Sequence, residues 1–304
     1  MGGVNCFRTA THSAARVLRR SWRPPRSWLI PGFIEGRSGG AIPVSTGALD
    51  RVPEGRLIDD LTLVIPSHNE AGSIAQVIRE WWEVRPRNAA MEILVVDDAS
   101  ADGTAQILND LQGEIPVRIV RNSRPQGYGG SLRIGIRHTR TPWVAFTDGD
   151  GQYDPRDLKS LLEPLSRGSD ISAGVRTQRA DPAIRRFISF GFRMLLWGFF
   201  GLQVRDPTGS LKAGRTEAFQ RVAERTSYMN ASFWSEFMVR SMQRGLTYEE
   251  VPVHHLPRRF GESKVVSNGL IIKVAVQQLI ALLRLWKELH RLEVGQTATA
   301  GVSS

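Results

Sequence analysis

Two aspartates, Asp148 and Asp150, are separated by one glycine and directly follow the apolar run 143–147. With only glycine between them, both carboxylates can reach a single hard cation. Mg²⁺ and Mn²⁺ prefer such oxygen ligands, and Mg²⁺ is usually shared between one or two carboxylates and substrate phosphates. An isolated Asp-Gly-Asp string is more often a solvated turn. Its position after a predicted strand, with Gln152 following, favours a metal site.

A second pair of acids, Asp97 and Asp98, ends the apolar run at residues 92–97. A carboxylate in this position can accept a hydrogen bond from a ribose hydroxyl or a nucleobase imino group. The alternative is a cap on the helix that follows Asp102. We expect Asp97 to face the ligand and Asp98 to be structural.

The elements that must position these acids begin at Leu61, where short β-rich runs start to alternate with segments of helical period. This alternation predicts an α/β fold, a mostly parallel sheet flanked by helices. The expected strands are residues 61–66, 92–97, 116–121, 143–147 and 170–175. The expected helices cover 74–81, 103–112, 132–136 and 158–165. Because ligands bind at the carboxyl ends of parallel strands, we expect segments 66–70, 97–100 and 148–152 to converge.

An ordered series of motifs resembles glycosyltransferase family 2, with its Rossmann-like GT-A fold, and within it the dolichol-phosphate mannosyltransferase-like branch. The resemblance runs from about Leu61 to Lys264. The matching positions are Pro66, Asn69 and Glu70, then Asp97, Asp98 and Ser100, then Gly127, Tyr128, Gly129 and Ser131, then Asp148, Asp150 and Gln152, then 206–209, then Arg258 and 261–264.

The resemblance implies a function, an inverting transfer of a hexose from a nucleoside-diphosphate sugar to a polyprenyl phosphate with Mg²⁺ or Mn²⁺. It also assigns residues by position. The nucleotide-sugar site is implied at Pro66, Asn69, Glu70, Asp97, Gly129, Asp148 and Gln152, and the metal site at Asp148, Asp150 and Gln152. The acceptor phosphate is implied at Lys212, Arg258, Ser263 and Lys264, and Asp150, Arg258 and Lys264 are the implied catalytic residues. Lys212 stands where this branch usually has arginine, and Lys lacks the bidentate fork of Arg.

The acceptor class depends on whether the reaction needs a general base. A sugar hydroxyl needs one, whereas a lipid monophosphate is already a nucleophile at neutral pH. The candidate base is Glu236, which lies in a segment with a helical apolar stripe. Three roles stay open for it: structural, orienting the acceptor or a loop, or catalytic base. The alternative function is therefore a soluble family 2 enzyme that glycosylates a hydroxyl with Glu236 as base.

Two long segments favour the lipid acceptor. Residues 185–204 mix aromatic side chains with arginines, and residues 270–292 interrupt leucines and isoleucines with Lys and Arg. Both patterns suit the headgroup level of a membrane, although core or dimer helices are the alternative. The uncharged runs are too short to span a bilayer. We expect peripheral contact at the cytoplasmic side and C-terminal amphipathic helices.

The charge of the chain points away from nucleic acid. The net charge is +10 over 304 residues, and six arginines among residues 1–34, with no acid, carry +6 of it. A nucleic-acid-binding protein would instead cluster its cations on the folded domain. The lone cysteine, Cys6, excludes a disulfide framework and a thiolate zinc site and suits a reducing compartment.

The predicted organisation is an Arg-rich disordered extension at 1–56, the glycosyltransferase domain at 57–264, an amphipathic helix at 265–294 and a frayed tail at 295–304. The extension also resembles a transit peptide. A sugar nucleotidyltransferase is disfavoured because residues 66–70 contain neither a glycine-rich cradle nor a cation. The sugar donor and the oligomeric state stay open.

Overall fold

A computed structural model of the chain describes residues 58–87, 89–177, 183–258 and 268–300. These residues belong to one compact unit, Val44–Ser304. The predicted extension at 1–56 lies outside the described residues, as do Ser263 and Lys264.

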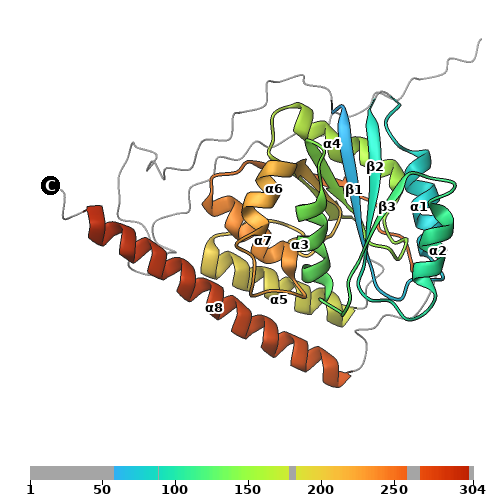
Figure 1. The fold of residues 1–304 in the computed structure, drawn as a ribbon. Coiled ribbons are helices and arrows are strands. Elements are labelled where there is room, and N and C mark those ends of the chain that lie inside the picture. Colours follow the sequence, from blue (N-terminus) through green and yellow to red (C-terminus); the bar gives the residue numbers. More distant parts are fainter. Residues whose placement is uncertain (1–57, 88, 178–182, 259–267, 301–304) are drawn as a thin grey trace, which may run out of the picture. The chain divides into compact units, whose positions relative to one another are not determined.

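Seven strands form one sheet in the order β3-β2-β1-β4-β6-β5-β7 (Figure 1). The strands β1, β2, β3 and β4 pair in parallel, as do β5 and β7, while β6 runs antiparallel to both β4 and β5. Their bounds are Asp60–Ser67 for β1, Ala90–Asp97 for β2, Val117–Arg121 for β3, Trp143–Phe146 for β4, Ile171–Arg176 for β5, Lys212–Arg215 for β6 and Tyr248–Val253 for β7. The mostly parallel sheet predicted from the sequence is confirmed.

Helices cover both faces of this sheet, so its central strands are apolar at successive positions rather than at alternate ones. In β1, Leu63 and Ile65 belong to one buried cluster and Val64 belongs to the other. On the side of Leu63 lie α1 (Ile74–Glu83), α2 (Thr104–Leu111) and α4 (Leu158–Ser166).

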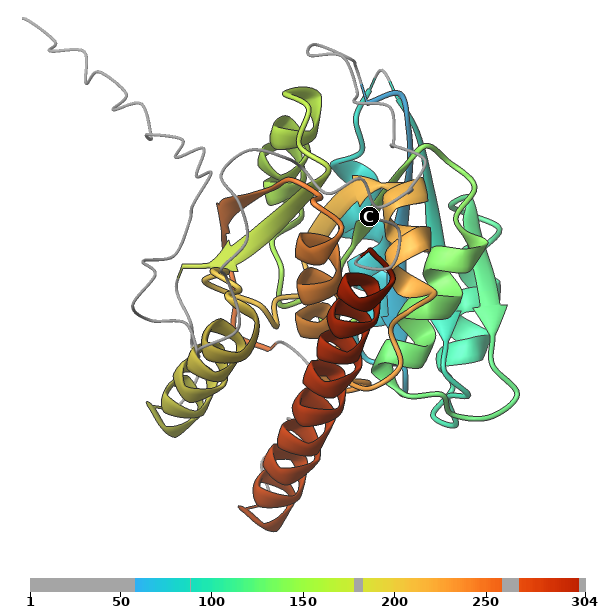
Figure 2. The ribbon, with the colours of Figure 1, turned by 90° about the vertical axis from the view of Figure 1, so that its left-hand side faces the viewer.

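On the side of Val64 lie α3 (Tyr128–His138), α6 (Thr216–Ala223) and α7 (Phe233–Gln243). The same cluster takes in side chains of α5 (Ala183–Phe200) and α8 (Asn268–Ala300), which form an outer layer next to α7 (Figures 1 and 2). In the part of the chain that the structure describes, no helix has the length and apolar character needed to cross a bilayer.

The structure differs from the sequence pattern in three places. The strands β6 and β7 were not predicted, because neither contains a run of apolar residues. The helix α3 begins at Tyr128, so Gly129 and Gly130 belong to its first turn rather than to a preceding loop. The helix α8 continues to Ala300, past the expected end at residue 294 and into the segment expected to be a frayed tail. Extending an existing helix costs little, whereas starting one is unfavourable.

The order of the strands decides where a ligand can bind. The chain leaves β1 toward β2 on one side, while β4 pairs with β1 on the other side. A sheet that reverses its strand order opens a crevice at the carboxyl ends of the strands concerned. The loops after β1, β2 and β4 carry the polar residues that the sequence singled out.

Candidate active site

The loops after β1 and β2 are joined by hydrogen bonds. The backbone N–H of Asn69 donates to Ser100 Oγ at 2.9 Å, and Asn69 Oδ1 accepts from the N–H of Ala101 at 2.8 Å. Asn69 and Ala99 both have φ of 54°, a left-handed backbone that is uncommon outside glycine. Pro66 pairs with Val96 in the sheet, and Glu70 donates its N–H to Thr104 Oγ1 at 3.0 Å. The structure thus brings the predicted residues of both loops together.

Asp97 and Asp98 differ in their contacts, and those of Asp98 are structural. Asp98 accepts from the N–H groups of Gln126 and Gly127 at 2.7 and 2.8 Å, so it holds the chain entering α3. Asp97 is fully buried, and its Oδ1 accepts from the N–H of Ser100 at 3.0 Å. Its Oδ2 lies 3.3 Å from Arg121 Nε. An open pocket of about 390 Å³ next to this strand end is lined by Ala99, Arg121, Asn122 and Ser123.

The Asp148 carboxylate is fixed on both of its oxygens. Tyr128 Oη donates to Oδ1 at 3.1 Å, and Ser210 Oγ donates to Oδ2 at 2.5 Å. Trp234 Nε1 in turn donates to Tyr128 Oη at 3.1 Å, which orients the phenol. Burial and the neighbouring Asp150 carboxylate raise the pKa of Asp148 to about 6. The two hydroxyls therefore hold a carboxylate whose charged form is disfavoured by burial and by Asp150.

Asp150 lies beside an arginine that comes from far along the chain. Arg258 Nη2 donates to Asp150 Oδ2 at 3.1 Å and lies 3.8 Å from Glu70 Oε1. The N–H of Gln152 donates to Asp150 Oδ1 at 3.1 Å, and Gln152 Nε2 donates to the carbonyl of Leu256 at 3.3 Å. Segment 150–152 is thereby tied to the segment that leads into the predicted acceptor loop.

The donor set at Asp148 and Asp150 fits a divalent cation. The two carboxylates are near enough for one to raise the pKa of the other, and a cation between them would offset that repulsion. Within the described residues, no group of three or more His, Cys, Asp and Glu side chains could hold a metal on its own. A site of two carboxylates completed by substrate phosphates is what Mg²⁺ commonly uses.

Gly129 serves a close backbone contact. Its N–H donates to the carbonyl of Asn230 at 3.0 Å, and a Cβ built on it would lie 2.7 Å from the same oxygen. Only glycine allows the start of α3 to approach the loop before α7 this closely. The contact is made at Gly129, the residue that follows Tyr128, and Tyr128 holds Asp148.

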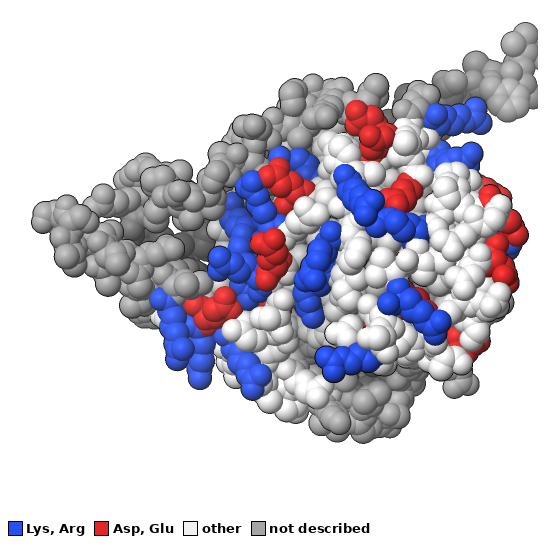
Figure 3. All heavy atoms as spheres, in the orientation of Figure 1, with Lys and Arg blue, Asp and Glu red and all other residues white. Residues whose placement is uncertain are grey.

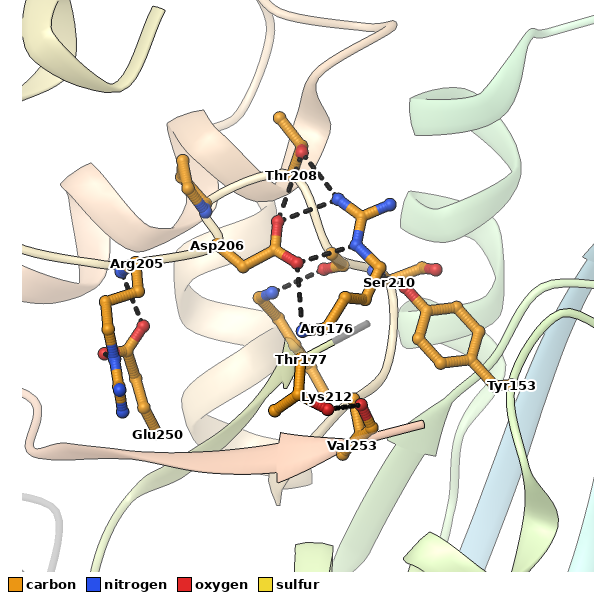
Figure 4. A network of polar contacts seen from close by, with 12 residues as sticks. Tyr153, Arg176, Thr177, Arg205, Asp206, Thr208, Ser210, Lys212, Glu250 and Val253 are labelled. Carbon is orange, nitrogen blue, oxygen red and sulfur yellow. Dashed lines mark hydrogen bonds and ion pairs between the residues drawn. The ribbon is translucent and has the colours of Figure 1, made fainter. Parts of the chain in front are cut away.

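A compact polar network surrounds Asp206 (Figure 4), and Ser210 links it to Asp148. Arg176 makes a two-pronged ion pair with Asp206, with Nε and Nη2 at 2.7 and 2.8 Å from the carboxylate oxygens, and Nη2 also donates to Thr208 Oγ1 at 3.1 Å. Lys212 is fully buried, and its Nζ donates to the carbonyl of Gly209 at 2.5 Å. Burial lowers the pKa of Lys212 to about 8.

This network shows what the sequence reasoning missed. Arg176 is the last residue of β5, and the rule that ligands gather at carboxyl ends of strands would have selected it. Lys212 was expected at the acceptor phosphate, but here it supports the loop 206–210 from inside the protein, against the ring of Trp234 at 5.4 Å. The loop it supports carries Ser210 to Asp148.

Of the predicted acceptor residues in segment 258–264, Arg258 is described, and the structure brings it to Asp150. Ser263 and Lys264 lie outside the described residues. Their predicted role is neither supported nor opposed by a contact in the structure.

Glu236 is buried and makes contacts of a structural kind. Its side chain is 1% exposed. It accepts from the N–H groups of Ser227, Tyr228 and Met229 at 3.1, 2.9 and 2.8 Å, and from Arg240 Nε at 2.9 Å. Both oxygens are thus committed to holding the loop before α7. Of the roles left open by the sequence, these contacts favour the structural, loop-orienting one.

Comparisons with known proteins show the family of this chain. The model of Glycosyl transferase family 2 matches residues 62–223, more than half of the chain. An uncharacterized protein of Methanocaldococcus jannaschii is 26% identical over 234 residues, 73% of this chain and 93% of that protein. The undecaprenyl-phosphate 4-deoxy-4-formamido-L-arabinose transferase of Pseudomonas fluorescens is 30% identical over 217 residues, 69% of this chain and 61% of the relative.

Solved structures show the same fold. Glucosyl-3-phosphoglycerate synthase from Mycobacterium tuberculosis, in complex with Mn²⁺, UDP-glucose and phosphoglyceric acid, superimposes with a TM-score of 0.60 at 17% identity, over 75% of this chain and 80% of that one. The same enzyme with Mg²⁺ and UDP gives a TM-score of 0.60 at the same coverage. With the sheet order, the acids at its carboxyl edge and the family match in agreement, the chain belongs to glycosyltransferase family 2 and is a glycosyltransferase of the GT-A fold.

Proposed function

We propose that this enzyme transfers a hexose from a nucleoside-diphosphate sugar to a polyprenyl phosphate at the cytoplasmic surface of a membrane, with Mg²⁺ or Mn²⁺. The observation that carries the proposal is the Asp148 and Asp150 pair at the end of β4, next to the loop of Asp97. The relative from Pseudomonas fluorescens is named for transfer to undecaprenyl phosphate. The synthase from Mycobacterium tuberculosis was crystallised with Mn²⁺ and UDP-glucose.

In this proposal the donor lies across the carboxyl ends of β1, β2 and β4. Pro66, Asn69, Glu70 and Asp97 take the nucleoside, and the buried Asp97 Oδ2 can accept from a base imino group or a ribose hydroxyl. Gly129 contributes by keeping α3 close to Asn230. We assign the catalytic unit to residues 57–264.

Asp148 and Asp150, with Gln152, would hold the metal. A bound divalent ion would stabilise the negative charge that develops on the departing diphosphate. Tyr128 and Ser210 keep the Asp148 carboxylate turned to one position, so little reorganisation is needed when the ion and donor bind.

The acceptor phosphate is assigned to Arg258, Ser263 and Lys264, with Lys212 acting through the loop it supports. Attack of a phosphate oxygen on the anomeric carbon, opposite the leaving diphosphate, would invert the configuration. A phosphate acceptor needs no general base, and this agrees with the full engagement of Glu236. Because Glu236 is fully engaged, we prefer a phosphate acceptor to a sugar hydroxyl.

The proposal is tested by incubating the purified chain with Mg²⁺ or Mn²⁺, a polyprenyl phosphate and a panel of nucleotide sugars, followed by mass spectrometry of the lipid fraction. We expect a polyprenyl-phosphate hexose with one donor and none after EDTA. Metal-dependent release of a nucleoside diphosphate without a lipid product would instead support the hydroxyl acceptor and return attention to Glu236.

A further inference from the structure

The exposed apolar side chains of this protein are concentrated on two helices. Among the described residues, every large hydrophobic side chain that is classed as exposed belongs to α5 or α8. They are Ile188, Phe190, Met194 and Leu195 on α5, and Val276, Leu279, Ile280 and Leu283 on α8, with exposures from 38% to 51%. Scattered exposed apolar residues are ordinary, but a contiguous set marks an interaction surface.

The helix α8 is apolar on two opposite sides. Leu282, Leu285 and Leu289 are buried in the core cluster. Val276, Leu279, Ile280 and Leu283 follow one another at offsets of 0, 3, 4 and 7, so they share a stripe on the side that faces away from that core. A helix that served only the fold would need the first stripe alone.

An ion pair fixes which side of α8 faces outward. Glu288 Oε2 lies 2.9 Å from Nη2 of Arg240, whose side chain is 2% exposed on α7. Rotating α8 to bury the second stripe would break this pair and leave the buried Arg240 guanidinium with Glu236 as its remaining acid. The exposed stripe is therefore a stable feature of the folded chain.

The two helices that carry the exposed side chains contact each other. Both lie in the outer layer (Figure 2), and the rings of Phe199 and Trp286 meet with centroids 6.1 Å apart. On α5, Leu196 and Phe200 turn into the core, while Phe190 and Met194 occupy the opposite side. The contact between the rings shows that the two helices touch each other.

Charge decides what this surface fits. The described side chains of the two helices, residues 188–200 and 274–291, include four cations, Arg193, Arg284, Lys287 and Arg291. They include one acid, Glu288, and it is paired with Arg240. Arg193 lies over the ring of Phe190 at 5.3 Å, at the border of the apolar region. Basic side chains also dominate the left-hand part of Figure 3, over α6 to α8.

We propose that α5 and the first half of α8 form a docking surface for an anionic lipid bilayer. Apolar side chains would enter the headgroup boundary, and the neighbouring cations would meet the lipid phosphates. A second copy of the chain is the less suitable occupant, because a symmetric contact would bring the cations of both copies together without an acid to pair them. The inference deepens the proposed function by giving the membrane contact a defined place.

The test is flotation of the full chain with vesicles of phosphatidylcholine, alone or mixed with phosphatidylglycerol. We expect the protein to float with the anionic vesicles, less with the neutral ones, and less at high salt. The double variant Leu279→Ser with Leu283→Ser should reduce the bound fraction about tenfold or more. Phe190→Ser tests α5 independently, since it leaves the packing of α8 untouched.

Charge-reversal variants measure the electrostatic contribution to vesicle binding separately from the apolar contribution. Reversing Arg284 and Lys287 to Glu should lower binding to anionic vesicles by roughly tenfold and remove the preference for them. The matched control is Lys159→Glu on α4, an exposed cation on the helix layer that covers the other face of the sheet, and it should bind as the wild type does. Thermal unfolding of each variant shows whether the fold is kept.

Two results would overturn the inference. One is wild-type flotation with anionic vesicles that is absent, or that the apolar and charge variants leave unchanged. The other is a stable dimer in sedimentation equilibrium that the Leu279 and Leu283 substitutions dissociate, because the surface would then belong to a second copy. Flotation needs neither donor nor acceptor, so its failure is separate from a failure to form lipid-linked sugar in detergent.

Discussion

Two groups of buried charged residues lie on the same face of the sheet, one with Asp148 and Lys212 and the other between α7 and α8. They differ in whether the protein favours the charged or the neutral form of each group. At the donor site, burial and Asp150 raise the pKa of Asp148, and burial lowers the pKa of Lys212. Both shifts favour the neutral form. Between α7 and α8, the pairing with Arg240 lowers the pKa of Glu288, and the two glutamates raise the pKa of Arg240 despite its burial.

The difference distinguishes a candidate ligand site from a structural network of ion pairs. In the α7 and α8 network each charge has its partner within the chain, as the four donors to Glu236 show. At the end of β4 two carboxylates lie together; Arg258 pairs with Asp150, while burial and Asp150 still raise the pKa of Asp148. Strongly perturbed pKa values in a crevice are typical of functional sites.

The largest effect should follow from Asp148→Asn and Asp150→Asn. Each should reduce metal-dependent turnover by about 10²-fold to 10³-fold or more, the scale of losing one preorganised electrostatic contact. Thermal unfolding should change little, because neither carboxylate is needed to balance a buried cation of the core. Retained turnover in either variant would mean that the metal binds elsewhere. The acids after β4 would then differ from the α7 and α8 network in pKa but not in function.

Glu236→Gln should act on stability. The substitution turns an amide NH₂ toward backbone N–H donors and leaves Arg240 with one acid fewer, a loss of about 3 kcal/mol in the free energy of unfolding. Chemical denaturation measures it, and Glu217→Gln, in the exposed pair with Arg221, is the control that should stay within about 0.5 kcal/mol. At a temperature where the variant is folded, turnover should fall by less than tenfold; a larger loss would restore Glu236 as a base.

The lowered pKa of Lys212 should make the free energy of unfolding depend on pH. Its pKa of about 8 lies below the ordinary value of 10.5, so the unfolded chain binds this proton more tightly. Between these two pH values the folded wild type should gain stability relative to Lys212→Met as pH rises, by up to about 3 kcal/mol. Denaturation of both proteins at pH 7.5 and pH 10 gives the difference, and a constant difference would mean that the lysine is fully compensated.

Glu288→Gln should have the smallest effect, because its carboxylate is 29% exposed. We expect a loss of about 1 kcal/mol in the free energy of unfolding. A double-mutant cycle with Arg240→Met isolates the pair, and a coupling energy near zero would show that α8 is held by its leucines alone.

Much of the donor site was predictable because it depends on local pattern. The strands were visible as apolar runs, and the acids Asp97, Asp148 and Asp150 were found by their position where those runs end. The rule that parallel strands end at one edge then predicted that their loops meet. The structure joins Asn69 to Ser100, and Arg258 contacts both Asp150 and Glu70. The same rule applied to β5 would have found Arg176.

The remaining features depend on contacts between distant parts of the chain. The antiparallel β6 has no apolar run, and its place between β4 and β5 is a matter of strand pairing. The helical stripe around Glu236 is compatible with a base and with a structural acid. Its role follows from the N–H groups of a loop that periodicity does not describe.

The sequence by itself determined the α/β fold, the family and the acids at the ends of the strands, because period, composition and spacing are properties of neighbouring residues. Only the tertiary structure decided that Tyr128 and Ser210 fix Asp148, that Lys212 points inward, and that α8 keeps an apolar stripe outside. Each of these depends on which surfaces pack together, since burial and hydrogen bonding are settled between segments that lie far apart in the chain.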